Sequence, residues 1–298
     1  MRAKECIGSL RLPFITSSII PFVFGSFLVF NTIDWPKFIF GLLAVVFAHL
    51  GANLLNDYAD SRSGCDWSDL KSYGFFGGSK LIQQGKLSEK FYFYSCILFF
   101  AASFICIVVV SLLAGGIKAI ILGLAIIFLA WAYSAKPLRL SYIGLGEPAV
   151  FILFGQGLVM GGYFIQTGIF PDMLSFVCSL PLAFLIMAIL LSNEVPDYPV
   201  DIIVHKKNWV VLLGPHKSYA VYLLIIAAAF ISISAAVVFG FISEISLFAL
   251  LPVIFGIKAA RVLRLYYDNK LRLVESSRLT ILMHNLTGII LIAAEIIR

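Results

Sequence analysis

Long apolar stretches alternate with short polar segments along the whole chain. Nine apolar runs are bounded by charged or turn-forming residues, and they cover residues 12–31, 37–55, 92–114, 118–133, 143–166, 173–192, 219–241, 245–263 and 279–297. One helical crossing of a bilayer needs about 20 mostly apolar residues. The pattern therefore predicts an all-α, polytopic membrane protein with nine transmembrane helices in a bundle, in a single domain that covers residues 1–298.

The composition supports this prediction and excludes a separate soluble domain. Of the 298 residues, 61% are hydrophobic and 13% are charged, whereas a soluble domain carries about 25% charged residues. The five cysteines are odd in number and include no Cys-x-x-Cys pair, so we expect neither a disulfide framework nor a zinc site. We interpret the basic N-terminal stretch as the start of an uncleaved first span.

The basic residues are distributed unequally between the two sides that nine crossings define. Of the 22 Lys and Arg residues, 19 fall on the side of the N-terminus, and only Lys37, Lys118 and Arg298 fall on the other. Cytoplasmic loops of membrane proteins are enriched in Lys and Arg. We therefore expect a cell-membrane protein with a cytoplasmic N-terminus, an outside C-terminus and three long cytoplasmic loops (56–91, 193–218 and 264–278). This topology explains the net charge of +6 without a nucleic-acid partner.

Two clusters of oxygen-bearing side chains stand where the second and sixth apolar runs end. In the first cluster, Asn56 and Asp60 are four residues apart and would share one helix face, and the second cluster repeats this spacing. The candidate metal ligands are Asn56, Asp60 and Asp66 in the first cluster, and Asn193, Asp197 and Asp201 in the second. Such groups are costly beside a membrane unless a cation lies between them. Carboxylates and amides suit Mg²⁺, which usually binds through a few carboxylates plus substrate phosphates. The sequence therefore predicts a magnesium diphosphate site.

The second cluster includes Pro196 and Pro199. Because proline breaks the backbone hydrogen-bond ladder, we expect a broken helix or a turn there. His49 lies within an apolar run, and we interpret it as a hydrogen-bonded packing residue.

A diphosphate also needs cationic and amide donors. The segment Gly77-Gly78-Ser79-Lys80 offers backbone N–H groups and an ammonium. The candidate diphosphate-binding residues are Lys80, Arg139, Lys136, Lys206 and Arg62. For each of them, the alternative is that it only contributes to the topology.

The chain resembles the UbiA-type intramembrane prenyltransferases at both clusters. The run Asn56-Asp57-Tyr58-Ala59-Asp60, with Gly64 and Asp66, looks like that family's NDxxDxxxxxD signature, and residues 193–201 resemble its second, DxxxD, signature. Segments 77–80, 84–88, 133–140, 144–147 and 193–198 look most similar to the branch that prenylates 1,4-dihydroxy-2-naphthoate in menaquinone biosynthesis. Pro199 and residues 202–205 depart from the family pattern, in which a charged, Gly-containing stretch follows the second motif.

The resemblance implies Mg²⁺-dependent transfer of a polyprenyl group from a polyprenyl diphosphate to an aromatic acceptor. It implies that the two clusters hold Mg²⁺, with Asp57, Asp60 and Asp197 as catalytic residues and Asp57 or Asp69 as the base. The prenyl tail would lie among the spans, next to the lipid bilayer. Other acceptors stay open, namely 4-hydroxybenzoate, homogentisate, haem or a glycerol phosphate ether lipid, and so does a different class of protein, an ion or phosphate transporter.

Overall fold

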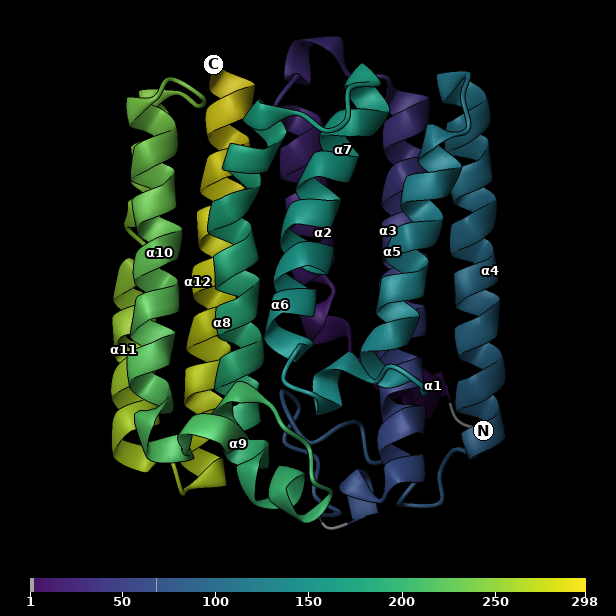
Figure 1. Cartoon of the computed structure of the whole chain (residues 1–298), viewed down its shortest axis with the longest axis vertical. Helices are drawn as coiled ribbons and strands as arrows, with labels where there is room; N and C mark the ends of the chain where they lie inside the picture. The colour runs from purple at the N-terminus through teal and green to yellow at the C-terminus, as the bar shows by residue number, and fades with distance from the viewer. Residues whose placement is uncertain (1–2, 68) are drawn as a thin grey trace.

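The protein is a bundle of long helices that run side by side (Figure 1). The computed structural model describes residues 3–67 and 69–298, and these residues form helices, turns and loops but no strand. The prediction of an all-α fold is therefore confirmed. The uninterrupted helices of 17 or more residues among those described are α3 (Trp35–Ser63), α4 (Glu89–Ala114), α5 (Lys118–Ser134), α8 (Met173–Ile203), α10 (Ser218–Val238) and α12 (Lys270–Ile297).

Three further parts of the bundle are interrupted or bent. At the N-terminus, α1 (Ala3–Ser9) and the short helix η1 (Leu12–Phe14) precede α2 (Thr16–Phe27), and the two halves of this unit meet at a bend of 52°. The central unit consists of α6 (Gly146–Val150), the π-helical turns η5 (Phe151–Gly157) and α7 (Leu158–Thr167). Near the C-terminus, η7 (Glu244–Leu250) precedes α11 (Val253–Tyr266). Short connecting helices are η2 (Phe30–Thr32), η3 (Cys65–Trp67), η4 (Leu140–Tyr142), α9 (Trp209–Leu213) and η6 (Pro215–Lys217).

Each of the nine predicted apolar runs overlaps a helix, but the structure does not confirm nine membrane crossings. Among the described residues, seven helices are long and apolar enough to span a membrane, or eight if the bent N-terminal unit is one span. Helix α5 has 17 residues, which corresponds to about 25 Å at 1.5 Å per residue. It is therefore shorter than the ~30 Å hydrocarbon core of a bilayer.

The second cluster lies within an unbroken helix. Helix α8 continues through Pro196 and Pro199, so the prediction of a break or turn there is wrong. A proline removes one backbone donor, and helices of membrane proteins tolerate this loss because neighbouring groups satisfy the freed carbonyl. As a result, Asn193, Asp197 and Asp201 stay in one helical register.

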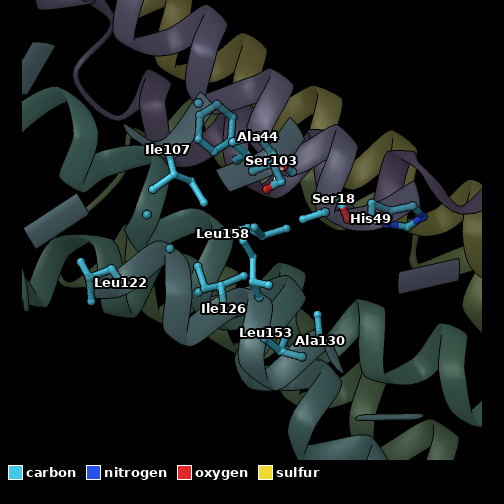
Figure 2. Close-up of a pocket in the computed structure, with 18 of the residues that line it drawn as sticks. Ser18, Ala44, His49, Ser103, Ile107, Leu122, Ile126, Ala130, Leu153 and Leu158 are labelled. Atoms are coloured by element: carbon cyan, nitrogen blue, oxygen red, sulfur yellow. Dashed lines mark hydrogen bonds between the residues drawn. The ribbon is translucent and has the colours of Figure 1, made fainter. Parts of the chain in front are cut away.

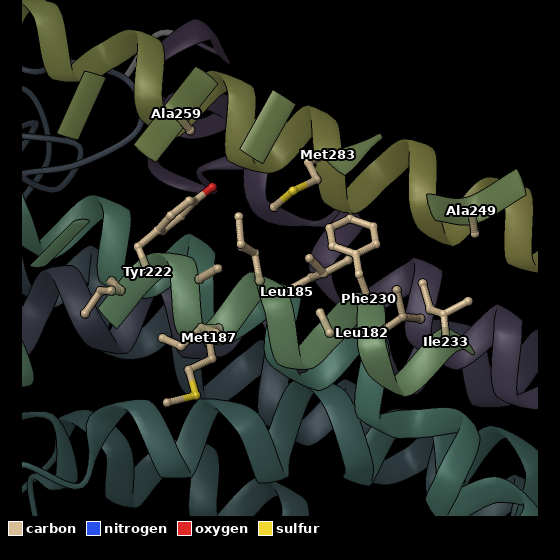
Figure 3. Close-up of a cluster of buried hydrophobic side chains, with 14 of the residues drawn as sticks. Leu182, Leu185, Met187, Tyr222, Phe230, Ile233, Ala249, Ala259 and Met283 are labelled. Carbon is tan, nitrogen blue, oxygen red and sulfur yellow. The ribbon is translucent and has the colours of Figure 1, made fainter. Parts of the chain in front are cut away.

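The two sides of the bundle differ in how they are filled. On the side of α3, α4, α5 and α7, the described residues surround an apolar cavity of about 860 Å³, a volume that includes space open to the outside (Figure 2). On the side of α8, α10, α11 and α12, large side chains such as Leu185, Tyr222 and Met283 pack into a continuous core (Figure 3). The filled side gives α8 a rigid backing, and the hollow side leaves room for a ligand.

Close helix contacts hold the middle of the bundle together. A Cβ atom at Gly155 would lie 2.1 Å from the Cβ of Ala183 on α8, and one at Gly25 would lie 1.9 Å from the carbonyl oxygen of Val159 on α7. Glycine is therefore required at both positions. Small residues commonly permit such close approach between membrane helices.

Candidate active site

The two oxygen-bearing clusters meet at one end of the bundle, where α3 and α8 end. They line a cavity of about 1320 Å³, which includes space open to solvent. All six predicted metal ligands are among its lining residues: Asn56, Asp60, Asp66, Asn193, Asp197 and Asp201. The fold thus brings together two segments that are far apart in the sequence.

The first cluster starts on the last turns of α3. Asn56 Nδ2 donates to Asp60 Oδ2 at 3.3 Å, as the four-residue spacing predicts. Asn56 Oδ1 accepts from Arg11 Nη1 at 3.0 Å, and Asp60 Oδ1 accepts from the Tyr142 hydroxyl at 2.8 Å. These bonds fix the orientation of both side chains toward the cavity.

Two further carboxylates of this region are bound by basic partners. Asp57 is 2% exposed; it pairs with Arg11 at 3.3 Å and accepts from the backbone N–H of Ser79 at 3.1 Å. Asp66 lies beyond α3, in η3, and accepts from Lys80 Nζ at 2.8 Å. Asp57 therefore belongs to the wall of the site, whereas Asp66 faces the cavity.

Residues 74–80 form a loop between the clusters. The backbone N–H of Gly77 donates to Asp197 Oδ2 at 3.2 Å. A Cβ at Gly78, whose φ is +72°, would lie 2.8 Å from Asp66 Oδ2. In this structure the donors that the sequence suggests for a diphosphate, including Lys80, therefore bind the carboxylates of both clusters.

The second cluster uses consecutive turns of α8. Asp201 is 1% exposed; its Oδ2 accepts from Asn208 Nδ2 at 2.6 Å, and its Oδ1 lies 3.5 Å from Lys206 Nζ. The Oδ1 atom of Asn193 is buried and has no hydrogen-bond partner among the described residues. A buried amide oxygen without a partner is energetically costly, so this atom fits a ligand role.

The donor set is consistent with a hard divalent cation bound together with phosphate. The described lining carries six carboxylates and four basic side chains. No group of three His, Cys, Asp or Glu within residues 3–67 and 69–298 is arranged to hold a metal ion by itself. Since Mg²⁺ keeps several waters and is usually held by one or two carboxylates plus substrate phosphates, the residues present fit a metal that enters with its diphosphate.

Burial and like charge change the ionisation of this end of the bundle. Burial, together with the nearby charges of Asp60 and Asp57, raises the pKa of Asp66 to about 7. Burial disfavours the charged form of Lys206, but the charges of Asp201 and Asp60 outweigh it and hold its pKa well above the usual value. The site thus keeps its ammonium and has an excess of negative charge that a cation would relieve.

The five predicted diphosphate-binding residues separate into two groups. Lys80 and Lys206 line the cavity. Arg139 lies over the Tyr142 ring, with its guanidinium carbon 3.6 Å from the ring centroid. Lys136 and Arg62 are exposed. These last three side chains are outside the described lining.

Arg11 and Lys270 also line the cavity, although the sequence suggested only a topological role for them. Lys270 pairs with Asp69 at 2.7 Å. Each residue belongs to a segment that is distant in sequence from both clusters, so no motif marks it.

A shared backbone feature is visible only in the structure: the described non-glycine residues with positive φ all lie in loops at this end of the bundle. They are Arg11 (φ 51°), Lys80 (φ 62°), Arg139 (φ 45°) and His205 (φ 56°). Such costly conformations cluster at functional sites.

The polar cavity and the apolar cavity adjoin each other. Five residues line both cavities, and we call the boundary that they form the neck: His49, Ala52, Ala130, Leu153 and Phe154. The apolar cavity extends from Ser18 and His49 at one end to Ile107 and Leu122 at the other (Figure 2). The combined shape suits a ligand with an anionic head and a long apolar tail.

Comparison with known families decides what kind of protein this is. The model of the UbiA prenyltransferase family matches residues 18–282, which is most of the chain and includes both clusters. The chain belongs to the UbiA prenyltransferase family. The family resemblance inferred from the two motifs is thereby confirmed.

Curated relatives of this UbiA-family protein include naphthoate prenyltransferases. It is 26% identical over 244 residues to the 1,4-dihydroxy-2-naphthoate octaprenyltransferase of Bacillus subtilis, covering 80% of this chain and 76% of that protein. It is 24% identical over 226 residues to the enzyme of the same name from Mycobacterium leprae, covering 75% of this chain and 74% of that protein.

Solved structures of UbiA homologues have the same fold. One from Aeropyrum pernix K1 superposes with a TM-score of 0.73 at 18% identity, covering 100% of this chain and 98% of that chain. One from Archaeoglobus fulgidus, bound to GPP and Mg²⁺, superposes with a TM-score of 0.67 at 16% identity, covering 97% and 99%. This UbiA-family chain is a multi-pass membrane enzyme that transfers prenyl groups.

Proposed function

We propose that this prenyltransferase joins a polyprenyl group from polyprenyl diphosphate to 1,4-dihydroxy-2-naphthoate, a step of menaquinone biosynthesis. One observation carries the proposal: a polar chamber rich in carboxylates adjoins a long apolar cavity, and five residues line both. The diphosphate belongs in the first and the prenyl chain in the second. The naphthoate acceptor is supported by the curated relatives that act on it.

In this proposal both clusters hold the metal-bound diphosphate. Asn56, Asp60 and Asp66 would bind Mg²⁺ from one side and Asn193, Asp197 and Asp201 from the other. When bound, Mg²⁺ supplies positive charge that stabilises the diphosphate as a leaving group. Lys80 and Lys206 line the same chamber and would neutralise charge that the metal leaves. Arg11 and Lys270, also in the lining, are added to this set.

The chemistry is an aromatic substitution. The allylic C–O bond of the prenyl diphosphate breaks and diphosphate leaves with the bonding electron pair. An electron-rich ring carbon of the acceptor forms the new C–C bond, and a proton then leaves the ring. Asp69 lines the cavity whereas Asp57 does not. Of the two candidate bases, we therefore favour Asp69, and we keep Asp57 as a residue that orients Arg11.

We further propose that the single domain crosses the cell membrane nine times, with the N-terminus and the active site on the cytoplasmic side. In this proposal the bent N-terminal unit would be the eighth crossing, beyond the seven helices that are long and apolar enough to span a membrane. The shorter, 17-residue helix α5 would be the ninth. In Figure 1 helix α1 lies at the lower end of the bundle and the C-terminus at the upper end, as an odd number of crossings requires. The orientation rests on the 19 basic residues of one side.

The test is a reconstituted assay with purified protein, radiolabelled polyprenyl diphosphate, Mg²⁺ and dihydroxynaphthoate. We expect a prenylated naphthoate, identified by mass spectrometry, whose formation stops with EDTA and returns when Mg²⁺ is added. Asp268, an exposed residue in the turn between α11 and α12, provides a control variant, Asp268→Asn, that should keep wild-type turnover.

The same assay distinguishes the other acceptors and the other class of protein. Turnover of 4-hydroxybenzoate, homogentisate, haem or a glycerol phosphate ether lipid, but not of dihydroxynaphthoate, would replace the acceptor and keep the chemistry. Metal-dependent flux through liposomes, without any prenylated product, would instead support a transporter.

A further inference from the structure

His49 lies at the neck between the two cavities, on the face of α3 that carries the first cluster. It precedes Asn56 by seven residues, which is two helical turns, so both side chains project from one face. At 1.5 Å per residue, the two positions are about 10 Å apart along the helix axis. His49 therefore stands where the polar chamber gives way to the apolar cavity.

One ring nitrogen of His49 has a hydrogen-bond partner and the other has none among the described residues. It is 4% exposed. Its Nδ1 shares a 2.7 Å hydrogen bond with Ser18 Oγ of α2, and the Phe154 ring meets it edge-on, with 5.8 Å between centroids. Its Nε2 is buried and has no hydrogen-bond partner among the described residues. A buried imidazole nitrogen without a partner loses its hydration and gains nothing in return.

The described lining of the apolar cavity has few polar side chains besides that of His49. Among the described lining residues, only Ser18, His49 and Ser103 have polar side chains. Ser18 is hydrogen-bonded to Nδ1 of His49, and the hydroxyl of Ser103 donates to the carbonyl oxygen of Ala44 at 2.8 Å. Among the described lining residues, Nε2 of His49 is therefore the side-chain nitrogen or oxygen that is left without a hydrogen-bond partner.

We propose that Nε2 of His49 hydrogen-bonds a ring hydroxyl of the aromatic acceptor and so orients the ring at the neck, with Ser18 as a positioning residue that fixes the imidazole. This inference rests on the proposed function, since it takes the acceptor to be a hydroxylated aromatic ring. An acceptor at the neck lies between the diphosphate chamber and the prenyl cavity, which is where the allylic carbon must be. Phe154 adds an aromatic wall at the same place.

A hydroxyl suits either form of the neutral imidazole. If Ser18 donates to Nδ1, then Nε2 carries the proton and donates to the hydroxyl oxygen. If Nδ1 carries the proton and donates to Ser18, then Nε2 accepts from the hydroxyl hydrogen. A hydroxyl can act as donor or acceptor, whereas an alkyl chain can do neither, so the prenyl tail does not satisfy this atom.

The experiment compares the KM values of the two substrates in purified full-length variants. His49→Phe keeps a planar ring and removes both nitrogens. We expect the acceptor KM to rise about tenfold, the effect of losing about 1.4 kcal/mol of binding, while the KM for polyprenyl diphosphate stays within about twofold. His49→Gln, which retains an amide near the position of Nε2, should recover part of the loss, and Ser18→Ala should give a smaller rise in the acceptor KM only.

His284 provides the matched control. It is also fully buried with an unpartnered Nε2, but it lies on α12 and lines neither cavity. His284→Phe should therefore leave both KM values unchanged, whatever it does to the melting temperature. An acceptor KM within twofold of wild type in His49→Phe, or equal rises in both KM values, would overturn the proposal.

Acceptor analogues locate the contact and separate this proposal from the proposed function. Two naphthoates, each lacking one ring hydroxyl, serve as competitive inhibitors, and His49→Phe should leave the inhibition constant of one of them unchanged. If both constants rise equally, His49 does not contact a hydroxyl. If the wild type fails to prenylate dihydroxynaphthoate, the proposed acceptor is wrong, and the KM comparison is made with the phenolic acceptor that the wild type does prenylate.

Discussion

The two clusters have the same sequence spacing at their start but are assembled in different ways. In the second, Asn193, Asp197 and Asp201 are held at four-residue intervals by the continuous helix α8. In the first, α3 ends at Ser63 and Asp66 follows in a separate turn. A helix alone therefore positions one set of ligands, while the other depends on tertiary contacts.

The contacts that complete the first cluster come from the loop between α3 and α4. Lys80 binds Asp66, and the backbone N–H of Ser79 binds Asp57. The same loop reaches the second cluster through Gly77 and Asp197. This difference means that damage to the loop should affect the first cluster most, whereas damage to α8 should act on the second.

The largest effect should come from removing one carboxylate from each cluster. We expect Asp60→Asn and Asp197→Asn to lower kcat by at least about a hundredfold, because preorganised charge at a transition state is worth this much. Asparagine keeps the shape of each side chain and loses the negative charge. Steady-state assays at saturating substrates measure the effect, and melting temperatures check folding. A large loss in one variant with wild-type turnover in the other would show that only one cluster holds the metal.

The next effect should come from the loop. Gly78→Ala places a Cβ 2.8 Å from Asp66 Oδ2 at a φ of +72°, whereas Gly74→Ala meets a similar backbone conformation, φ +84°, with no atom within 4 Å. Left-handed backbone costs alanine about 1–2 kcal/mol in both variants. We therefore expect both variants to lower the melting temperature, Gly78→Ala by the larger amount because Asp66 must shift, and a drop in kcat of about tenfold only in Gly78→Ala. Equal kcat values would contradict loop-dependent assembly of the first cluster.

A smaller effect is expected at the contact that supports Asp201. Asn208 donates to Asp201 at 2.6 Å and also caps α9 by accepting from the backbone N–H of Val211. Asn208→Ser keeps a capping group but is too short to reach Asp201. Because α8 and Lys206 still hold the carboxylate, we expect kcat to fall only about two- to fivefold, less than the tenfold that 1.4 kcal/mol represents. A loss of kcat as large as that of Asp197→Asn would mean that helix α8 alone does not position the Asp201 carboxylate.

The sequence predicted the parts of the site that depend on local geometry. The spacing of Asn56 and Asp60 placed them on one helix face, and the hydrogen bond between them confirms it. The prolines led to a wrong prediction for α8, because the local rule for proline ignores the neighbouring groups that support a helix within a packed bundle.

The parts of the site that the sequence did not predict are contacts between distant segments. Arg11 comes from the N-terminal unit and Lys270 from the start of α12, yet both line the cavity. Each was part of a basic stretch that topology already explained, so no local pattern marked it. His49 was predicted to be a hydrogen-bonded packing residue, and its burial and its hydrogen bond to Ser18 confirm this. The structure adds that its Nε2 has no partner among the described residues and that the side chain lines two adjoining cavities.

The smallest effects should come from the basic residues that lie outside the cavity. Arg62 is exposed and 3.6 Å from Glu89, and Lys136 is exposed beside the loop after α5. Exposed ion pairs contribute about 0–1 kcal/mol. We therefore expect Arg62→Ala and Lys136→Ala to change the KM for polyprenyl diphosphate by less than about twofold, whereas Lys80→Ala, which removes the partner of Asp66, should raise it about tenfold. A tenfold rise in Arg62→Ala or Lys136→Ala would show that these side chains move onto the diphosphate when it binds, and that the first cluster is completed by the substrate as well as by its loop.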